Sequence, residues 1–387
     1  MKILMINVVC GIKSTGRICA DLAETLVAQG HNVKIAYGRE KVPEEYQKYA
    51  VKIGTDLDVN VHAIKARIFD SMGFESTYVT KKFITWIKDY DPDVIHLHNL
   101  HGYYINVEIL FKYLKTCGKK IIWTLHDCWA FTGHCTHFDY IGCEEWKKGC
   151  KKCLQKREYP KCYGPSFSER NFKRKEELFS NIPNMIIVTP SIWLAKLVQQ
   201  SFLNCYQIKT IHNGIDISIF KKIETSNQSK NELGKKKVIL GVASQWNQKK
   251  GFQYMLELSK RLSEQIVIVG VSQKQKNILP DNVIGICHTN KVEELVQWYN
   301  LADVFVNPTL EDNYPTTNLE AIACGTPVIS FDSGGSAESA ALYGAVVPRG
   351  NYQELEYAIR DILNVLPEYP RVDLSKEKML KEYTNLY

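Results

Sequence analysis

The sequence predicts an α/β fold of two domains, each built on a parallel, doubly wound sheet. Short apolar runs alternate with amphipathic segments of helix length, as they do in β-α-β units. The same alternation begins again in the second half of the chain, and 387 residues are enough to bury two separate cores. We therefore expect ligands at the carboxyl ends of the strands, where such sheets bind them.

The predicted elements follow this alternation in order. Strands of the first half are expected over residues 2–9, 31–38, 93–98, 119–127 and 184–191. Strands of the second half are expected over residues 236–244, 265–271, 282–287, 303–309, 326–332 and 344–348. Helices are expected over residues 15–30, 251–262, 292–302 and 373–387. We place the first domain at residues 1–205 and the second at residues 206–372.

The composition is that of an ordinary soluble globular protein, with 45% hydrophobic and 24% charged residues. No apolar run reaches the roughly 18 residues that a membrane-spanning helix needs, and the apolar start predicts a first strand rather than a signal peptide. Residues 1–200 carry 29 Lys and Arg against 21 Asp and Glu, whereas residues 201–387 carry 20 against 21. The basic first half suits phosphates or an anionic membrane face, and no nucleic-acid motif is present. We expect a cytoplasmic protein.

The most informative segment is PTLEDNYPTTNLEAIACGTPV, residues 308–328. Pro315 and the Thr-Thr-Asn after it predict the start of a helix. Glu311 and Asp312 then lie in the loop before the helix, and Glu320 lies in its early part. Backbone amides at such a helix start can bind a phosphate, and carboxylates beside that anion indicate sugar hydroxyls as their partners. Alternatively, Glu311 and Asp312 only stabilise the start of the helix, and Glu320 is a solvated surface residue.

This segment resembles the acid–seven residues–acid motif of the retaining glycosyltransferases of family 4, which have the GT-B fold of two Rossmann-like domains facing a cleft. Other stretches match that family in the same order, namely STGR, PDVIHLHN, TLHD, VTPS, NGID, KKG and GGSAE. Each stretch alone is a weak signal, but the ordered set covers most of the chain. The EDNYP form is most similar to the branch that builds bacterial surface polysaccharides.

The resemblance implies roles for the residues of the acidic segment. Glu320 would hold the nucleotide ribose, and Asp312 would contact hydroxyls of the donor sugar. The family usually has Glu where this chain has Asp312, so the adjacent Glu311 is an alternative for that role. The pocket for the sugar diphosphate would be lined, mostly through backbone groups, by Asn313, Tyr314, Pro315 and Thr316.

Lys249 and Lys250 precede a predicted helix of the second domain. By resemblance, Lys250 would neutralise the charge that builds on the leaving diphosphate, a contribution that is often the largest in catalysis. The family usually has an arginine five or six residues earlier, where this chain has Gln245 and Ser244. Lys249 is the candidate to replace it, and a solvated turn is the structural alternative for the lysine pair.

Thr15 and Gly16 are expected in the turn after the first strand. A glycine there lets the backbone approach a phosphate, so both residues are candidates for donor binding. The three-glycine dinucleotide fingerprint is absent, because this stretch has only Gly11 and Gly16. Its absence argues against a hydride-transfer enzyme.

Histidines lie at the ends of two predicted strands. His126 ends the strand at residues 119–127, and the resemblance places it near the donor sugar, where it would bind a hydroxyl or the transferring centre. A structural hydrogen bond is the usual role of an isolated histidine at a strand end. His96 and His98 alternate along the preceding strand, so we expect them to point to opposite faces, with His98 toward the ligand.

Six of the twelve cysteines fall within residues 128–162. Four with the spacing C-x7-C-x6-C-x2-C are Cys135, Cys143, Cys150 and Cys153. In a reducing compartment this cluster favours a structural zinc site, and a metal would order a polar loop that has no core of its own. His134 or His137 could replace one ligand, and disulfides or free thiols are the alternatives. The loop would shape the acceptor side of the cleft.

These features predict an enzyme that moves a sugar from a nucleotide-diphosphate sugar to a hydroxyl acceptor and keeps the anomeric configuration. The resemblance implies an acceptor bound by the first domain, a donor bound by the second, a final helix at residues 373–387 that packs back onto the first domain, and catalysis without a metal. UDP is preferred to GDP because it is the commoner carrier in the family. A glycan or a lipid-linked oligosaccharide at the inner membrane face suits the basic first half.

Other interpretations stay open. A sugar-nucleotide 2-epimerase of the same fold would convert its substrate without an acceptor, and a glycan phosphorylase would need a pyridoxal lysine that no motif marks. A catalytically silent scaffold that binds nucleotide sugars would explain the altered acid and the missing arginine.

Overall fold

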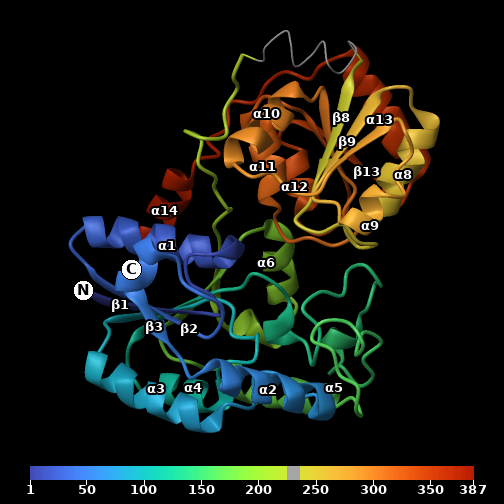
Figure 1. Cartoon of the computed structure of the whole chain (residues 1–387). Helices are drawn as coiled ribbons and strands as arrows, with labels where there is room; N and C mark the ends of the chain where they lie inside the picture. The colour runs from blue at the N-terminus through green and yellow to red at the C-terminus, as the bar shows by residue number, and fades with distance from the viewer. Residues whose placement is uncertain (225–235) are drawn as a thin grey trace. The chain divides into compact units, whose positions relative to one another are not determined.

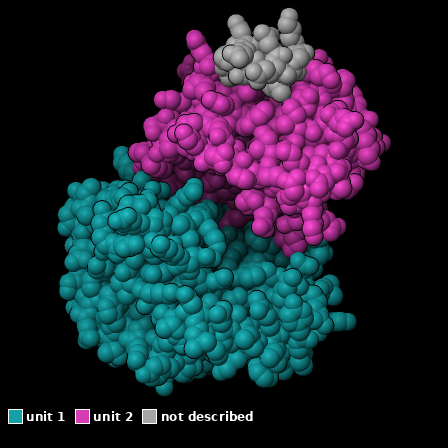
Figure 2. Space-filling view, in the orientation of Figure 1, with its two compact units in different colours: residues 1–211, 380–387 teal, residues 212–379 magenta. Residues whose placement is uncertain are grey.

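The structure is a computed structural model of the chain, and it describes residues 1–224 and 236–387. These residues form two compact units (Figure 2). Unit 1 comprises Met1–Ile211 together with Leu380–Tyr387, and unit 2 comprises His212–Met379. Each unit contains one parallel sheet with helices packed on it (Figure 1), so the predicted α/β class is confirmed.

Unit 1 is built on a seven-stranded sheet. Its strands are β1 Lys2–Asn7, β2 Asn32–Tyr37, β3 Ala50–Lys52, β4 Val94–Leu97, β5 Lys120–Thr124, β6 Met185–Thr189 and β7 Gln207–Thr210. They lie in the order β3-β2-β1-β4-β5-β6-β7, and every pair is parallel. The order reverses at β1, where Met5 is level with Ile35 of β2 and with His96 of β4. Such a switch point is the usual place for a ligand in this class of sheet.

Helices cover both faces of this sheet, which explains why its central strands are apolar on both sides. The α-helices of unit 1 are α1 Lys13–Ala28, α2 Asp56–Phe69, α3 Thr77–Tyr90, α4 Val107–Leu114, α5 Ser168–Phe179 and α6 Ile192–Gln199. Shorter 3₁₀ helices are η1 Glu44–Tyr49, η2 Trp129–Phe131, η3 Glu145–Lys147 and η4 Phe202–Cys205. The start of α2 is defined by a capping box between Thr55 and Asp58.

Unit 2 repeats the architecture in its described residues. The strands are β8 Val238–Val242, β9 Gln265–Val269, β10 Val283–Ile286, β11 Val304–Asn307, β12 Val328–Phe331 and β13 Gly344–Val347. The helices are α8 Phe252–Arg261, α9 Gln273–Lys276, α10 Val292–Leu301, α11 Thr316–Ala323, α12 Ser336–Ala340 and α13 Tyr352–Asn364. The strands lie in the order β10-β9-β8-β11-β12-β13, and the switch point is between β8 and β11.

The end of unit 1 differs from the predicted boundary at residue 205. Strand β7, which the apolar pattern did not reveal, pairs with β6, where Ile187 is level with Ile208. Its remaining residues are polar and partly exposed, as is common for a strand at the edge of a sheet. Unit 1 therefore continues to Ile211.

The helix predicted at residues 373–387 is α14, Lys376–Thr384, and the boundary between the units falls within it. Near its start, Lys376 is paired with Asp216 of unit 2 at 2.6 Å. The residues after Met379 belong to unit 1, where Tyr383 is buried and its hydroxyl accepts a 3.3 Å hydrogen bond from Thr124. Among the described residues, no helix combines the length and the hydropathy that crossing a bilayer requires.

Candidate functional site

Three loops meet at the carboxyl edge of the unit 2 sheet, after the adjacent strands β8, β11 and β12. The carbonyl of Lys249 accepts a 2.7 Å hydrogen bond from the N–H of Leu310 and a 3.3 Å bond from the Thr309 hydroxyl. The carbonyl of Asp312 accepts a 3.1 Å bond from the N–H of Gly335. The KKG, EDNYP and GGSAE stretches, which are distant in sequence, are therefore brought together.

Two glycines allow the loops to approach this closely. Gly251 has a φ of +76°, and a Cβ at this position would lie 2.0 Å from the carbonyl oxygen of Pro308. Gly334 has a φ of +57°, and its Cβ would lie 1.9 Å from the carbonyl oxygen of Asp312. Side chains at these positions would face both an unfavourable backbone conformation and a clash with backbone atoms.

Two ion pairs link the lysine loop to the acidic segment. Lys249 Nζ lies 2.7 Å from Glu311 Oε1, and Lys250 Nζ lies 2.5 Å from Asp312 Oδ2. The Glu311 side chain is only 8% exposed, whereas that of Asp312 is 21% exposed and that of Lys250 is 37% exposed. The buried pair holds the two loops in register, and the outer pair is the one that a ligand can reach. This difference favours Asp312 over Glu311 for contact with a substrate.

The residues after Asp312 form the rest of the predicted pocket lining. The N–H of Asn313 donates to Asp312 Oδ1 at 2.9 Å. Tyr314 is buried, and its ring stacks on His212 with centroids 4.6 Å apart. Pro315 precedes Thr316, the first residue of α11, so the predicted helix start is confirmed.

Glu320 lies in the second turn of α11 and is partly exposed. Its Oε2 accepts a 2.9 Å hydrogen bond from the hydroxyl of Tyr299, which is completely buried in the core of unit 2. Burial raises the pKa of Tyr299 well above its ordinary value, and the neighbouring Glu320 raises it further. The tyrosine therefore remains a hydrogen-bond donor at neutral pH.

Sequence reasoning missed a buried polar network beneath these loops. Asn307 Nδ2 donates to Asn318 Oδ1 at 2.8 Å, and Asn318 Nδ2 donates to Ser339 Oγ at 2.9 Å. Ser330 and Ser336 share a 2.7 Å hydrogen bond. The network ties β11 and β12 to α11 and α12, and so sets the direction of both helix starts. The available signal was Asn307, a polar residue inside an apolar strand pattern.

Thr15 and Gly16 lie in the first turn of α1, as the helix expected over residues 15–30 has them, and not in the turn before it. The chain turns earlier, at Gly11, which has a φ of +72°. Thr15 Oγ1 accepts a 3.2 Å hydrogen bond from Asn7 Nδ2. A Cβ on Gly16 would lie 3.0 Å from Val9 Cγ2, so the glycine lets the helix pack closely against this turn.

His126 follows β5 and contacts a second histidine. Its Nε2 lies 3.1 Å from Nδ1 of His98, and the two rings stack. The rings of His96 and His98 are centred 4.1 Å apart, so the prediction that they point to opposite faces is wrong. Side chains two residues apart along a strand share a face. Burial lowers the pKa of His126 to about 4, although Asp127 opposes this, and the imidazole is neutral at pH 7.

Asp127 is a further charged residue at this edge that sequence reasoning did not assign. It lies directly after His126, and its Oδ2 is 2.6 Å from Nε2 of His101. Burial raises the pKa of the Asp127 carboxyl, but His101, His137 and the backbone hydrogen bond from Trp129 together lower it to about 2. The carboxylate is therefore ionised at neutral pH and orients His101. The TLHD stretch itself was the signal that could have revealed it.

The cysteine-rich loop is more apolar than its sequence indicates, because its aromatic residues pack into the hydrophobic core of unit 1. Trp146 is 2% exposed, and its ring packs on Phe131 and Phe138 at centroid distances of 5.4 and 5.1 Å. Lys175 of α5 is also buried, and its ammonium donates to the carbonyl of Trp129 at 2.7 Å. These aromatic residues are scattered among polar ones in sequence, which conceals the cluster.

The twelve cysteines, all of them described, are free thiols. The thiols of Cys135 and Cys153 are hydrogen-bonded to each other, and the N–H of Gly133 donates to Cys150 Sγ at 3.2 Å. Of the proposed replacement ligands, His134 is bonded through Nδ1 to Asp70 at 2.5 Å. Residues 1–224 and 236–387 contain no group of three or more His, Cys, Asp and Glu side chains arranged to hold a metal ion. Zinc binding by the four cysteines, Cys143 included, stays a prediction.

Comparisons with known proteins agree with this architecture. A family model described as Glycosyltransferase Family 4 matches residues 15–219, and one described as Glycosyl transferases group 1 matches residues 236–365. WcaC of Escherichia coli (strain K12), named for glycosyl transfer in colanic acid biosynthesis, is 25% identical over 100% of this chain and 99% of its own.

Two solved structures share the fold over the whole chain. Sucrose-phosphate synthase from Thermosynechococcus elongatus aligns with a TM-score of 0.70 at 16% identity, covering 100% of this chain and 98% of that one. Anabaena Alr3699/HepE in complex with UDP aligns with a TM-score of 0.65 at 14% identity, covering 100% and 99%. The predicted GT-B fold is confirmed. The chain belongs to glycosyltransferase family 4 and is a retaining glycosyltransferase that uses a nucleotide-diphosphate sugar.

Proposed function

We propose that the protein transfers a sugar from a UDP-sugar to a glycan or lipid-linked acceptor in the synthesis of a bacterial surface polysaccharide. The observation that carries this proposal is the Lys250–Asp312 pair, a partly exposed cation and carboxylate at the switch point of the unit 2 sheet. The UDP complex of Alr3699/HepE supports the choice of nucleotide, and the name of WcaC supports the choice of pathway class.

Unit 2 would bind the donor. The diphosphate competes with Asp312 for the Lys250 ammonium, and this exchange leaves the Asp312 carboxylate to accept hydroxyls of the sugar. Lys249, paired with the buried Glu311, holds the loop in place and adds positive charge. Glu320, oriented by Tyr299, accepts the ribose hydroxyls. Electrostatic stabilisation of the leaving diphosphate is the main catalytic contribution expected from these groups.

Unit 1 would bind the acceptor and supply His126. With its pKa lowered to about 4 by burial, this imidazole is uncharged at neutral pH and can exchange hydrogen bonds with a sugar hydroxyl. Thr15, in the first turn of α1, would offer its backbone amide to the substrate, and Gly16, without a side chain, would let the substrate come close. The four cysteines would hold a structural zinc, and catalysis itself would need no metal.

A peripheral contact with the cytoplasmic face of the inner membrane belongs to this proposal. The free thiols suit a reducing compartment.

One face of α2 exposes an apolar stripe made of Leu57, Val61, Ile64 and Ile68, with exposed fractions of 72%, 44%, 55% and 47%. Positions spaced by three and four residues share a helix face. Lys65 and Arg67 flank the stripe, and Lys65 is paired with Glu75 at 3.3 Å. Arg170 donates to the Phe69 carbonyl at the end of the helix. The charges of Arg67 and Arg170 suit anionic lipid.

Turnover of UDP-sugars with and without acceptor tests the proposal. We expect wild-type protein to bind UDP and to hydrolyse or transfer the donor, and Lys250→Ala and Glu320→Ala to lose most of this activity. Lys274→Ala removes an exposed lysine of α9 in the same unit and is the matched control. If Lys250→Ala and Glu320→Ala turned over the donor at the wild-type rate, the assignment of these residues to the donor site would be contradicted. Conversion of the nucleotide sugar to its epimer without any acceptor would indicate the epimerase instead.

A further inference from the structure

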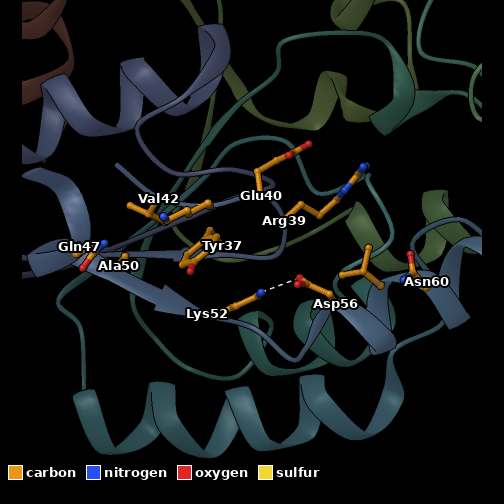
Figure 3. A pocket seen from close by; sticks show the side chains of 11 residues that line it. Tyr37, Arg39, Glu40, Val42, Gln47, Ala50, Lys52, Asp56 and Asn60 are labelled. Atoms are coloured by element: carbon orange, nitrogen blue, oxygen red, sulfur yellow. Dashed lines mark hydrogen bonds and ion pairs between the residues drawn. The ribbon is translucent and has the colours of Figure 1, made fainter. Parts of the chain in front are cut away.

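Unit 1 contains an open pocket of about 740 Å³ that the family motifs do not cover. It lies where β2 ends at Tyr37 and β3 ends at Lys52, beside the start of α2 at Asp56 (Figure 3). The carboxyl ends of parallel strands are where α/β sheets bind their ligands. The volume is in the range of sites for small molecules, and it suffices for one or two sugar rings.

The lining of the pocket is mostly polar, and its apolar part comes from Tyr37, Val42, Ala50 and Val59. Val42 and Val59 are 5% and 9% exposed, and the ring of Tyr37 is half-buried between the charged residues of the rim. An aromatic ring beside aliphatic side chains offers a flat surface for the C–H face of a sugar. The exposed amides of Gln47 and Asn60 complete the rim and can exchange hydrogen bonds with hydroxyl groups.

The rim carries positive charge that carboxylates of the chain do not neutralise. Lys52 is paired with Asp56 at 2.7 Å, on one side of Tyr37 (Figure 3). Glu40 is paired with Lys13 at 3.0 Å, so both carboxylates of the rim have a cation partner.

Arg39 and Lys41 are the remaining cations of this rim. Within the described parts of the chain, no carboxylate forms an ion pair with either of them. The Arg39 side chain extends away from the Tyr37 ring and lies apart from the Lys52–Asp56 pair (Figure 3). A mostly polar pocket with an aromatic ring in its wall and two cations outside any ion pair at its edge suits a sugar that carries a negative charge.

We propose that this pocket binds the acceptor through a sugar bearing an anionic group, either a carboxylate or a phosphate. Arg39 would bind the anion with two parallel hydrogen bonds, as guanidinium groups do with both anions, and Lys41 would add a second positive charge. The sugar ring lies on Tyr37 and Val59. This inference rests on the proposed function, because it names the acceptor class of the same enzyme.

The pocket and the apolar stripe belong to the same helix. Val59 and Asn60 of α2 line the pocket, whereas Val61 and Ile64 belong to the exposed stripe. A lipid-linked acceptor would therefore have its charged sugar within one helix diameter of the membrane surface.

Titration of three small probes, followed by NMR, tests the pocket directly. The probes are methyl β-glucuronide, glucose 6-phosphate and the neutral methyl β-glucoside. We expect at least one anionic probe to bind about tenfold more tightly than the neutral one, and added salt to weaken that binding. Preference for the glucuronide or for the phosphate tells which anion the acceptor carries. Equal affinity for all three probes, or no binding of either anionic probe, would overturn the proposal.

Variants then locate the binding. Arg39→Gln removes one charge at a partly exposed position, and Lys41→Gln removes one at an exposed position. We expect each variant to weaken binding of the anionic probe by about tenfold. Lys88→Gln removes an exposed charge from α3 of the same unit and should leave the affinity for the anionic probe unchanged. Retention of wild-type affinity by the Arg39→Gln/Lys41→Gln double variant would also overturn the proposal.

Binding of UDP, measured on the same samples, separates this inference from the proposed function. Arg39→Gln should bind UDP as the wild type does, while its affinity for the anionic probe decreases. If wild-type protein fails to bind UDP, the proposed donor is contradicted, whereas the probe titration still decides the pocket.

Discussion

The hydroxyl of Tyr299 donates a hydrogen bond of 2.9 Å to Oε2 of Glu320. The tyrosine is completely buried, whereas the glutamate is partly exposed on α11. One carboxylate oxygen is therefore attached to the rigid core of unit 2, and the carboxylate is oriented before any ligand arrives. Preorganisation of this kind reduces the entropy that binding must otherwise remove.

We expect Tyr299→Phe to weaken UDP binding by about tenfold, since it removes a hydrogen bond to a charged group but keeps the ring. Isothermal titration calorimetry with UDP measures the effect. Tyr343→Phe, which removes another buried tyrosine hydroxyl from unit 2, is the control. If Tyr299→Phe binds UDP as tightly as the control, Tyr299 has no part in orienting Glu320.

The stability of the protein should decrease as the pH falls below about 6.5. Burial lowers the pKa of His62 to about 3, compared with ~6.5 for an exposed histidine. The unfolded chain then takes up protons that the folded chain does not, so stability is complete above pH 6.5 and is lost as the pH falls toward 3. Each such histidine contributes up to ~1.4 kcal/mol per pH unit.

Urea unfolding at several pH values between 7 and 4 measures this slope. His62→Gln removes one of the neutral buried histidines, so its free energy of unfolding should depend less steeply on pH than that of the wild type. His288→Gln changes an exposed histidine and should leave the slope unchanged. Equal slopes for His62→Gln and wild type would show that His62 is not kept neutral by folding.

Charge on the exposed face of α2 should prevent membrane contact. We expect wild-type protein to sediment with vesicles that contain anionic phosphatidylglycerol, and Ile64→Glu/Ile68→Glu to stay in the supernatant, because both positions are on the apolar stripe. Ile278→Glu, at a position 66% exposed in unit 2, should sediment as wild type does. Equal sedimentation of all three proteins would exclude α2 as the lipid-binding face.

Metal analysis of protein purified without a His tag tests the zinc site. We expect about one zinc per chain, bound by the four thiolates, and loss of the metal in Cys135→Ser and Cys153→Ser. Cys205→Ser, which changes an exposed cysteine outside the loop, should keep it. Wild-type protein without zinc would show that the aromatic cluster around Trp146 alone orders the loop.

Local patterns in the chain were sufficient for the element classes and for part of the site. Apolar runs of strand length predicted the central strands, because strands buried on both faces are apolar throughout. The Pro-Thr-Thr-Asn stretch predicted where α11 begins, because helix starts depend on nearby residues. The ordered motifs placed Lys250, Asp312 and Glu320 in the correct unit.

The partners of these residues depended on the tertiary structure. Tyr299 of α10 meets Glu320 of α11 because these two helices pack against each other, and Lys249 meets Glu311 because the order of the strands places the loops after β8 and β11 side by side. The same order pairs β7 with β6 and places His98 against His126. Hydrogen bonds and ion pairs act over only a few ångströms, so partners distant along the chain become visible only when the packing of the sheet defines which strand ends are neighbours.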